Sequence, residues 1–76
     1  MNIELNAIMS RFPEYRERIL KQIKENEEFE SLCSEYELCV DILRTIDKEA
    51  ELRKSELHEY LEIKIELEQE VMKYLG

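Results

Sequence analysis

Hydrophobic side chains recur every three or four residues over most of the chain, from Phe29 to Tyr74. Alternating steps of three and four keep one face of an α-helix turned toward a partner, whereas a strand would need a hydrophobic residue at every second position. Only Arg53 and Lys64 interrupt the stripe, so the pattern predicts an all-α fold. The stripe consists of Phe29, Leu32, Tyr36, Cys39, Leu43, Ile46, Ala50, Arg53, Leu57, Tyr60, Lys64, Leu67, Val71 and Tyr74.

Two long helices are expected from this stripe, at 27–46 and 51–75. Further apolar residues widen both faces, and a wide face suits a bundle in which each helix meets two neighbours. The polar segment 47–50 contains neither glycine nor proline, so the chain either turns back there as a hairpin or continues as one rod of about 70 Å. The wide faces and the polar gap favour the hairpin, whereas the unbroken register favours the rod. The flanking apolar residues are Cys33, Val40, Ile42, Leu61, Ile63 and Leu75.

The N-terminal third predicts shorter elements. Residues 1–11 contain enough apolar side chains for a short helical turn, or form a frayed extension. Proline is favoured at the first position of a helix and pushes the preceding residue out of the α region. Phe12 is therefore expected to be a boundary, and a helix is predicted at 13–24. Asn26, followed by two glutamates, reads as the N-cap of the next helix.

Length and composition indicate one small domain that would gain stability from self-association. A chain of 76 residues buries only a modest fraction of its unfolded surface. The chain has 39% charged residues with one glycine and one proline, a bias typical of long helices and coiled coils. Self-association is the obvious way to cover the stripe.

The net charge of -8, from 19 acidic against 11 basic side chains, argues against nonspecific binding to nucleic acids or anionic lipids. There is no run of 18 apolar residues to span a membrane and no N-terminal secretory signal, so we expect a cytoplasmic protein. Basic residues gather between Arg11 and Lys24, whereas Glu25 to Asp41 holds seven acids and no base. This split could pair the short helix of one copy with the hairpin of another.

The two cysteines, Cys33 and Cys39, are six residues apart. On one helix they would point about 240° apart and lie about 9 Å from each other along the axis. They cannot form a disulfide within that helix. We therefore expect two thiols that pack as small apolar groups in a reducing compartment.

No constellation of residues indicates an enzyme, a metal site or a cofactor. A nucleophilic mechanism would have to combine a cysteine or serine with His58, the single histidine, which adjoins Leu57 and is expected to be solvated or locally bonded at the edge of the packed face. A di-metal bundle needs Glu-x-x-His spacing, but His58 follows Glu56 by two residues. With Gly76 as the only glycine, no phosphate-binding loop can form.

Lys64 is the most unusual residue of the stripe. The simpler interpretation is that its aliphatic stem packs while its ammonium group reaches a neighbouring glutamate. The alternative is control of register or oligomeric state, because one polar group in an apolar interface penalises other pairings.

The run Phe12-Pro13-Glu14-Tyr15-Arg16 and the residues that follow resemble the opening of the YdcH-like family of short bacterial proteins. A looser similarity continues to about residue 75, and an eleven-residue segment precedes Phe12 where family members begin almost at that phenylalanine. The resemblance implies a short helix followed by a helical hairpin, and no established activity. The other residues that carry it are Ile19, Ile23, Lys24, Asn26, Phe29, Leu32, Tyr36, Leu43, Leu61, Ile63, Lys64, Glu66 and Leu67.

The sequence thus predicts a non-enzymatic interaction or scaffold module of the all-α class. We expect a short helix and a helical hairpin that self-associates, as a homodimeric four-helix bundle or a higher oligomer, with a protein partner as a further possibility. The alternative is an acidic inhibitor that occupies the basic groove of a nucleic-acid-binding protein. Phe12 and Tyr15 are the favoured partner contacts, since they lie outside the hairpin. The full expected interface is Phe12, Tyr15, Ile19, Phe29, Leu32, Tyr36, Leu43, Leu57, Tyr60, Lys64, Leu67 and Val71.

Overall fold

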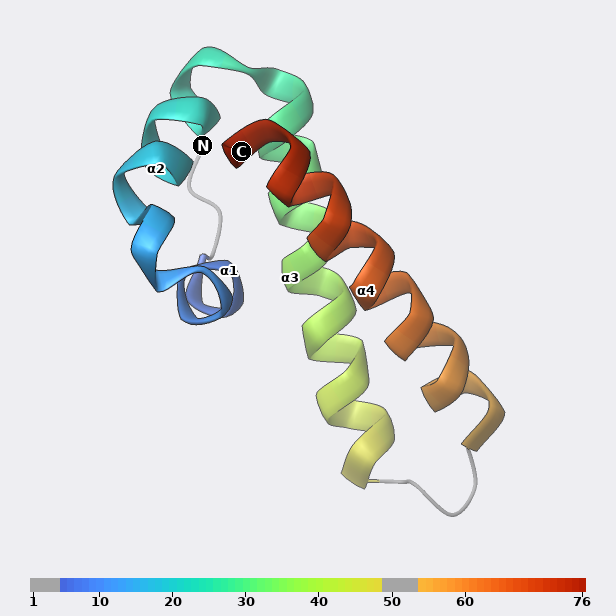
Figure 1. Cartoon of the computed structure of the whole chain (residues 1–76). Coiled ribbons are helices and arrows are strands. Elements are labelled where there is room, and N and C mark those ends of the chain that lie inside the picture. Colours follow the sequence, from blue (N-terminus) through green and yellow to red (C-terminus); the bar gives the residue numbers. More distant parts are fainter. Residues whose placement is uncertain (1–4, 49–53) are drawn as a thin grey trace.

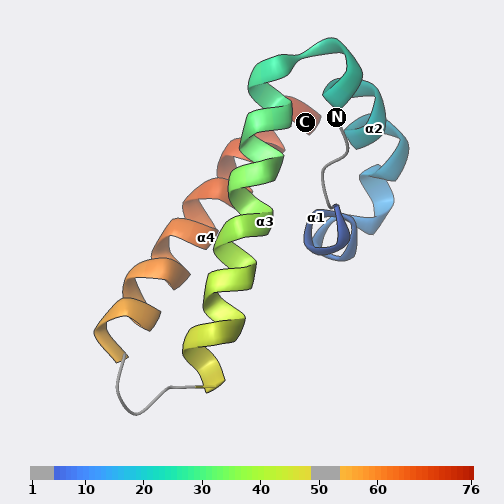
Figure 2. The same ribbon diagram turned by 180° about the vertical axis from the view of Figure 1, so that it is seen from behind.

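The computed structural model describes residues 5–48 and 54–76, and this part of the chain is all-α. The two long helices lie side by side and run in opposite directions, while the short N-terminal elements pack against the open end of this hairpin (Figures 1 and 2). The elements are α1 (Asn6–Arg11), a 3-10 turn η1 (Pro13–Tyr15), α2 (Arg16–Glu25), α3 (Glu27–Lys48) and α4 (Lys54–Leu75).

The hairpin is confirmed, and the single rod is excluded by contacts between α3 and α4. The hydroxyl group of Tyr36 lies 2.7 Å from Glu68 Oε2, and Cys39 Sγ lies 3.4 Å from the carbonyl oxygen of Tyr60. Residues 49–53, which include the stripe positions Ala50 and Arg53, lie outside the described residues. The expected start of the second helix at residue 51 therefore lies outside the described residues, in which α4 begins at Lys54.

The predicted N-terminal boundaries hold, with one correction. Phe12 separates α1 from η1 with φ -126° and ψ 62°, outside the α region that a following proline disfavours. The prediction of an α-helix from Pro13 was wrong for its first turn, because residues 13–15 form a 3-10 turn and α2 begins at Arg16. Such tighter turns are frequent at helix N-termini. Asn26 caps α3 as predicted: its Oδ1 accepts the amide hydrogens of Glu28 and Phe29 at 3.0 and 3.3 Å.

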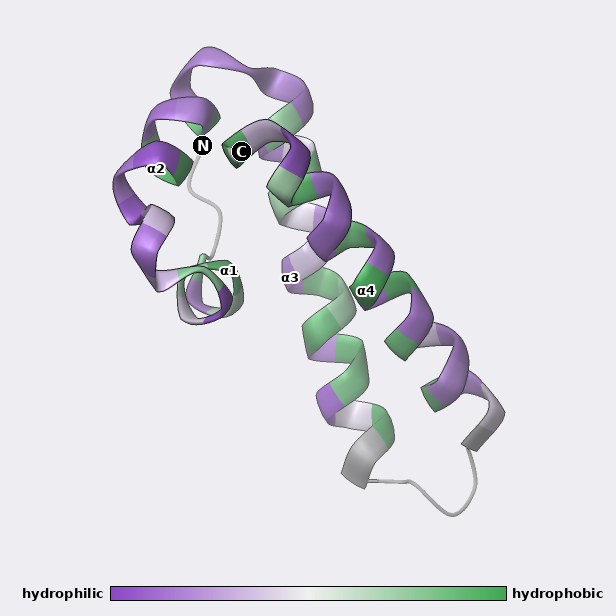
Figure 3. Ribbon diagram, viewed as in Figure 1, coloured by the Kyte–Doolittle hydropathy of each residue, from purple (hydrophilic) through white to green (hydrophobic). Residues whose placement is uncertain are grey.

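The core lies where the N-terminal segment, residues 5–25, meets the open half of the hairpin. Hydrophobic residues recur along α3 and α4, whereas α2 is mostly hydrophilic (Figure 3). Helix α3 packs against α4 and also against α1 and α2, which explains why its apolar face is wider than a two-helix coiled coil requires. The core residues are Ile8, Phe12, Ile19, Phe29, Cys33, Tyr36, Val71 and Leu75.

Helix α1 packs firmly although it has no capping side chain of its own. Ile8 is fully buried. The carboxylate of Glu37 on α3 accepts the amide hydrogens of Ala7 and Ile8 at 3.1 and 2.8 Å. A carboxylate at this position satisfies amides that have no partner within the helix and complements its positive end. The alternative of a frayed extension therefore does not describe residues 6–11.

Candidate functional site

A groove runs between η1 and α4 on the surface of the described chain. Its first part has a volume of about 400 Å³, and its second part, of about 370 Å³, shares Arg11, Phe12 and Met72 with the first. We call the whole depression the η1–α4 groove. Its lining residues are Arg11, Phe12, Pro13, Glu14, Tyr15, Ile65, Glu68, Gln69 and Met72.

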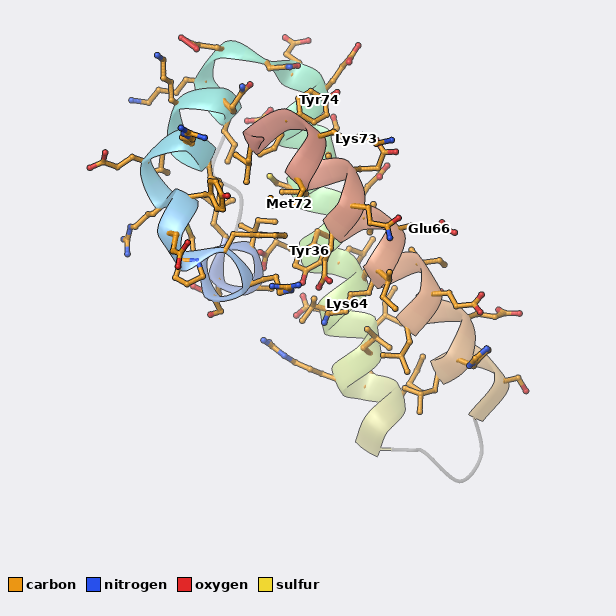
Figure 4. The ribbon with its side chains drawn as sticks, in the orientation of Figure 1. Tyr36, Lys64, Glu66, Met72, Lys73 and Tyr74 are labelled. Atoms are coloured by element: carbon orange, nitrogen blue, oxygen red, sulfur yellow. The ribbon has the colours of Figure 1, made fainter. Side chains whose placement is uncertain are left out.

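Ile65 and Met72 of α4 line one wall of the groove, and Leu61 continues this row of exposed hydrophobic side chains beyond it. Leu61, Ile65 and Met72 are 44%, 55% and 37% exposed. Spacings of four and seven residues place them on one side of the helix. Met72 projects toward the N-terminal segment, while Glu66 and Lys73 project away from it (Figure 4). The row is therefore an apolar surface that the chain itself leaves open.

The base of the groove is built by the bend at Phe12. This ring is only 5% exposed, because the non-helical conformation of Phe12 before Pro13 turns it into the core. The guanidinium group of Arg11 lies 5.1 Å from the centre of the Phe12 ring, and that of Arg18 lies 5.8 Å from the centre of the Tyr15 ring. Cations over aromatic rings are attracted to their π faces. The groove thus offers an aromatic base, an apolar wall and a positive edge.

Glu68 forms the polar junction beneath the groove. Its Oε2 accepts a hydrogen bond from Tyr36 of α3 at 2.7 Å and lies 3.2 Å from Arg11 Nε of α1. Lys64, one turn earlier on α4, approaches the same oxygen at 3.3 Å. One carboxylate therefore joins three helices, which fixes the position of α1 and hence the shape of the groove.

The ionisation of this junction follows from its neighbours. Burial by itself raises the pKa of Glu68, but the hydrogen bond from Tyr36 and the positive charges of Lys64 and Arg11 outweigh burial and lower the pKa overall. The pKa of Tyr36 is raised, first by burial and then by its hydrogen bond to Glu68. The pair is thus held as a neutral phenol that donates to an ionised carboxylate.

Helix α2 is attached to the C-terminal end of the hairpin. Arg18 Nη1 donates to the carbonyl oxygen of Leu75 at 2.8 Å, a position where a cation complements the negative end of α4. The side-chain amide of Gln22 lies 3.5 Å from the carbonyl oxygen of Tyr74. Tyr74 also packs on Phe29, with ring centres 5.3 Å apart. Contacts at both ends therefore hold the N-terminal segment across the hairpin.

The structure places many of the expected interface residues within the core of a single chain. Ile19, Phe29, Tyr36 and Val71 are fully buried or nearly so and have no side-chain surface to offer a second molecule in this conformation, whereas Phe12, 5% exposed, contributes only the base of the groove. The others are partly exposed: Tyr15, Leu32, Leu43, Leu57, Tyr60, Lys64 and Leu67. Of the two favoured partner contacts, Phe12 supports the groove from below and Tyr15 lines it. Their role in binding a partner stays a prediction.

The environments predicted for Lys64, His58 and the two cysteines are confirmed. Lys64 reaches Glu68, as the simpler interpretation expected. His58 is 76% exposed and lies 3.2 Å from Glu62 Oε1. Cys33 and Cys39 are buried free thiols. Burial, with smaller contributions from Glu37 and Glu30, raises the pKa of Cys33 to about 12.

Sequence reasoning missed the residues that shape the groove. Arg11, Glu37 and Glu68 were counted only among the charges, although Glu68 follows Lys64 by the four residues of a helical ion pair. Met72 and Ile65 were not included in the interface, because they lie beside the stripe. The row of Leu61, Ile65 and Met72 could have been found by searching for a second stripe at the same spacing.

The described residues show no cluster of three histidine, cysteine or acidic side chains arranged to hold a metal ion. None of the described helices is long and apolar enough to cross a membrane.

No family model, curated protein or solved structure matches the chain. The similarity to the YdcH-like family therefore stays a prediction from the residues.

Proposed function

We propose that the protein is a small non-enzymatic interaction module that self-associates through the η1–α4 groove and the adjoining apolar row of α4. The observation that carries this proposal is the row itself. Leu61, Ile65 and Met72 remain exposed beside an aromatic base, although the N-terminal segment packs against the open half of the hairpin. Apolar surface of this kind, bordered by polar residues, is typical of protein-binding sites.

The preferred partner is a second copy of the chain. A domain of 76 residues has a small core for its size, and burial of the α4 row in a dimer would add apolar contacts that one copy lacks. Each hydrophobic side chain that becomes fully buried contributes roughly 1.5–3 kcal/mol. Because this contribution is apolar, the contact should persist at high salt.

The test is sedimentation equilibrium of the native protein and two matched variants, Ile65→Glu and Ile63→Glu. Both isoleucines are exposed, at 55% and 41%, but positions two residues apart lie on different sides of a helix. We expect the native protein and Ile63→Glu to dimerise and Ile65→Glu to be a monomer, with unchanged circular dichroism in all three. A monomeric native protein, or equal behaviour of the two variants, would contradict the proposal.

A further inference from the structure

A second depression, separate from the groove, lies between α1 and α2. It has a volume of about 630 Å³ and is lined by Leu5, Asn6, Met9, Ser10, Arg16 and Leu20. We call it the α1–α2 hollow. Leu20 is 42% exposed although it belongs to the short, mostly polar helix α2. The hollow is thus lined by three apolar and three polar side chains, and Leu20 is an apolar group in it that the described chain leaves exposed.

One basic side chain, Arg16, lines this hollow, and a second, Lys24, follows further along α2. Arg16 and Lys24 precede and follow Leu20 by four residues, so the three form one row along α2. Residues 16–24 carry four basic side chains against one acidic. Arg18 is already bound to the carbonyl oxygen of Leu75, whereas Arg16 and Lys24 make no ion pair within the described part of the chain. Two cations are thus available to an acidic partner.

The opposite pattern appears on the outer face of α3. Leu38 is 61% exposed, more than any other large hydrophobic side chain of the described residues. Glu35 and Asp41 lie three residues before and after it, within one turn. Residues 27–46 carry six acidic side chains against one basic. Glu35 has no ion pair among the described residues, and Asp41 has only an exposed contact of 3.6 Å with Arg44.

We propose that the α1–α2 hollow of one copy receives Leu38 of a second copy, with Arg16 and Lys24 beside the acidic residues Glu35 and Asp41 of that copy. An apolar centre surrounded by complementary charges is the usual arrangement of a specific interface. The inference rests on the proposed self-association and adds a second contact to it. Because the hollow and the outer face of α3 are different surfaces, the contact is heterologous and can join copies head to tail.

Charge reversal gives a direct test. One variant carries Arg16→Glu and Lys24→Glu, and the other carries Glu35→Lys and Asp41→Lys; all four side chains are exposed in the native fold. Each variant alone places like charges on both sides of the contact, so we expect self-association about tenfold weaker than in the native protein. In a one-to-one mixture every contact between the two different variants pairs opposite charges again. The mixture should therefore associate at least as tightly as the native protein at low salt.

Sedimentation velocity of each variant and of the mixture, at low and high salt, measures these differences. Association that weakens with salt in the native protein and is restored in the mixture supports the contact. A mixture no tighter than its components, or variants that associate like the native protein, would overturn it. The Ile65→Glu variant separates the two proposals. If Ile65→Glu abolishes all association and charge reversal has no effect, the contact through the η1–α4 groove is supported and the contact through the α1–α2 hollow is rejected. The converse result rejects the contact through the η1–α4 groove and supports the contact through the α1–α2 hollow.

Discussion

Tyr36 and Glu68, 32 residues apart in sequence, form a hydrogen bond of 2.7 Å that joins α3 to α4. The same carboxylate oxygen also forms an ion pair with Arg11 of α1, whose Nε lies 3.2 Å away. The bond therefore stabilises more than the hairpin, because it fixes the acceptor on which the N-terminal segment docks. The position of α1, and with it the η1–α4 groove, depends on this junction.

Replacing Tyr36 with phenylalanine should destabilise the protein without unfolding it. The ring remains in the core, while Glu68 loses one donor and keeps Arg11 and Lys64. We expect a loss of about 1–2 kcal/mol, as for a hydrogen bond to a charged group, measured by urea unfolding. Tyr74→Phe is the matched control, because its hydroxyl group makes a longer, exposed contact of 3.3 Å with Glu28. An equal loss of stability in the two variants would show that the hydrogen bond between Tyr36 and Glu68 contributes no more than the exposed contact of Tyr74.

The stability should depend on pH through Glu68. Its pKa in the folded state lies below its ordinary value of 4.5, so the ionised carboxylate stabilises the fold above that pH. This contribution should disappear as the pH falls through the folded pKa. We expect Glu68→Gln to be less stable than the native protein at neutral pH, with a difference that shrinks below about pH 4.5. A difference in the free energy of unfolding that stays constant down to pH 2 would contradict this assignment.

Glu37 should control the docking of α1. Glu37→Ala removes the acceptor of the Ala7 and Ile8 amides, and the loss should be about 1 kcal/mol or more. We expect faster amide hydrogen exchange in α1, with little change in α4. Glu35→Ala is the control on the same helix, because Glu35 has no hydrogen-bond partner in the described part of the chain. Unchanged exchange in Glu37→Ala would mean that packing of Ile8 alone holds α1.

The two thiols should react slowly in the native protein. Burial raises the pKa of both Cys33 and Cys39, that of Cys33 to about 12, so very little thiolate exists at pH 8. We expect labelling by a disulfide reagent to be limited by unfolding, and both thiols to react at once in denaturant. Single Cys33→Ser and Cys39→Ser variants would separate the two rates. A native rate equal to that in denaturant would contradict the burial of the thiol concerned.

The raised pKa of Cys33 also predicts a loss of stability in alkali. Its folded value lies above the ordinary value of 9.0, so the neutral thiol contributes fully below pH 9 and its contribution is lost as the pH rises toward 12. The difference in unfolding free energy between the native protein and Cys33→Ser, followed over this range, measures the effect. A difference independent of pH would show that Cys33 ionises equally easily in both states.

The sequence by itself determined the helical elements and two of their boundaries, Phe12 and Asn26. The steps of three and four from Phe29 to Tyr74 predicted helices, Phe12 before Pro13 predicted a boundary, and Asn26 predicted a cap, all of which the structure confirms. These features depend on residues within one or two turns of each other, so local physics is sufficient to predict them. The width of the apolar face also indicated that α3 would meet two neighbours.

Only the tertiary structure decided which part of that face is covered and which stays open. Phe12 lies in the core rather than at the surface, and Ile65 and Met72 lie beside a groove, because the bend before Pro13 folds residues 5–25 back over one half of the hairpin. Glu37 and Glu68 became the acceptors for α1 for the same reason. Periodicity determines the face of each helix but not the position of one helix along another, and contacts across about 30 residues depend on that position.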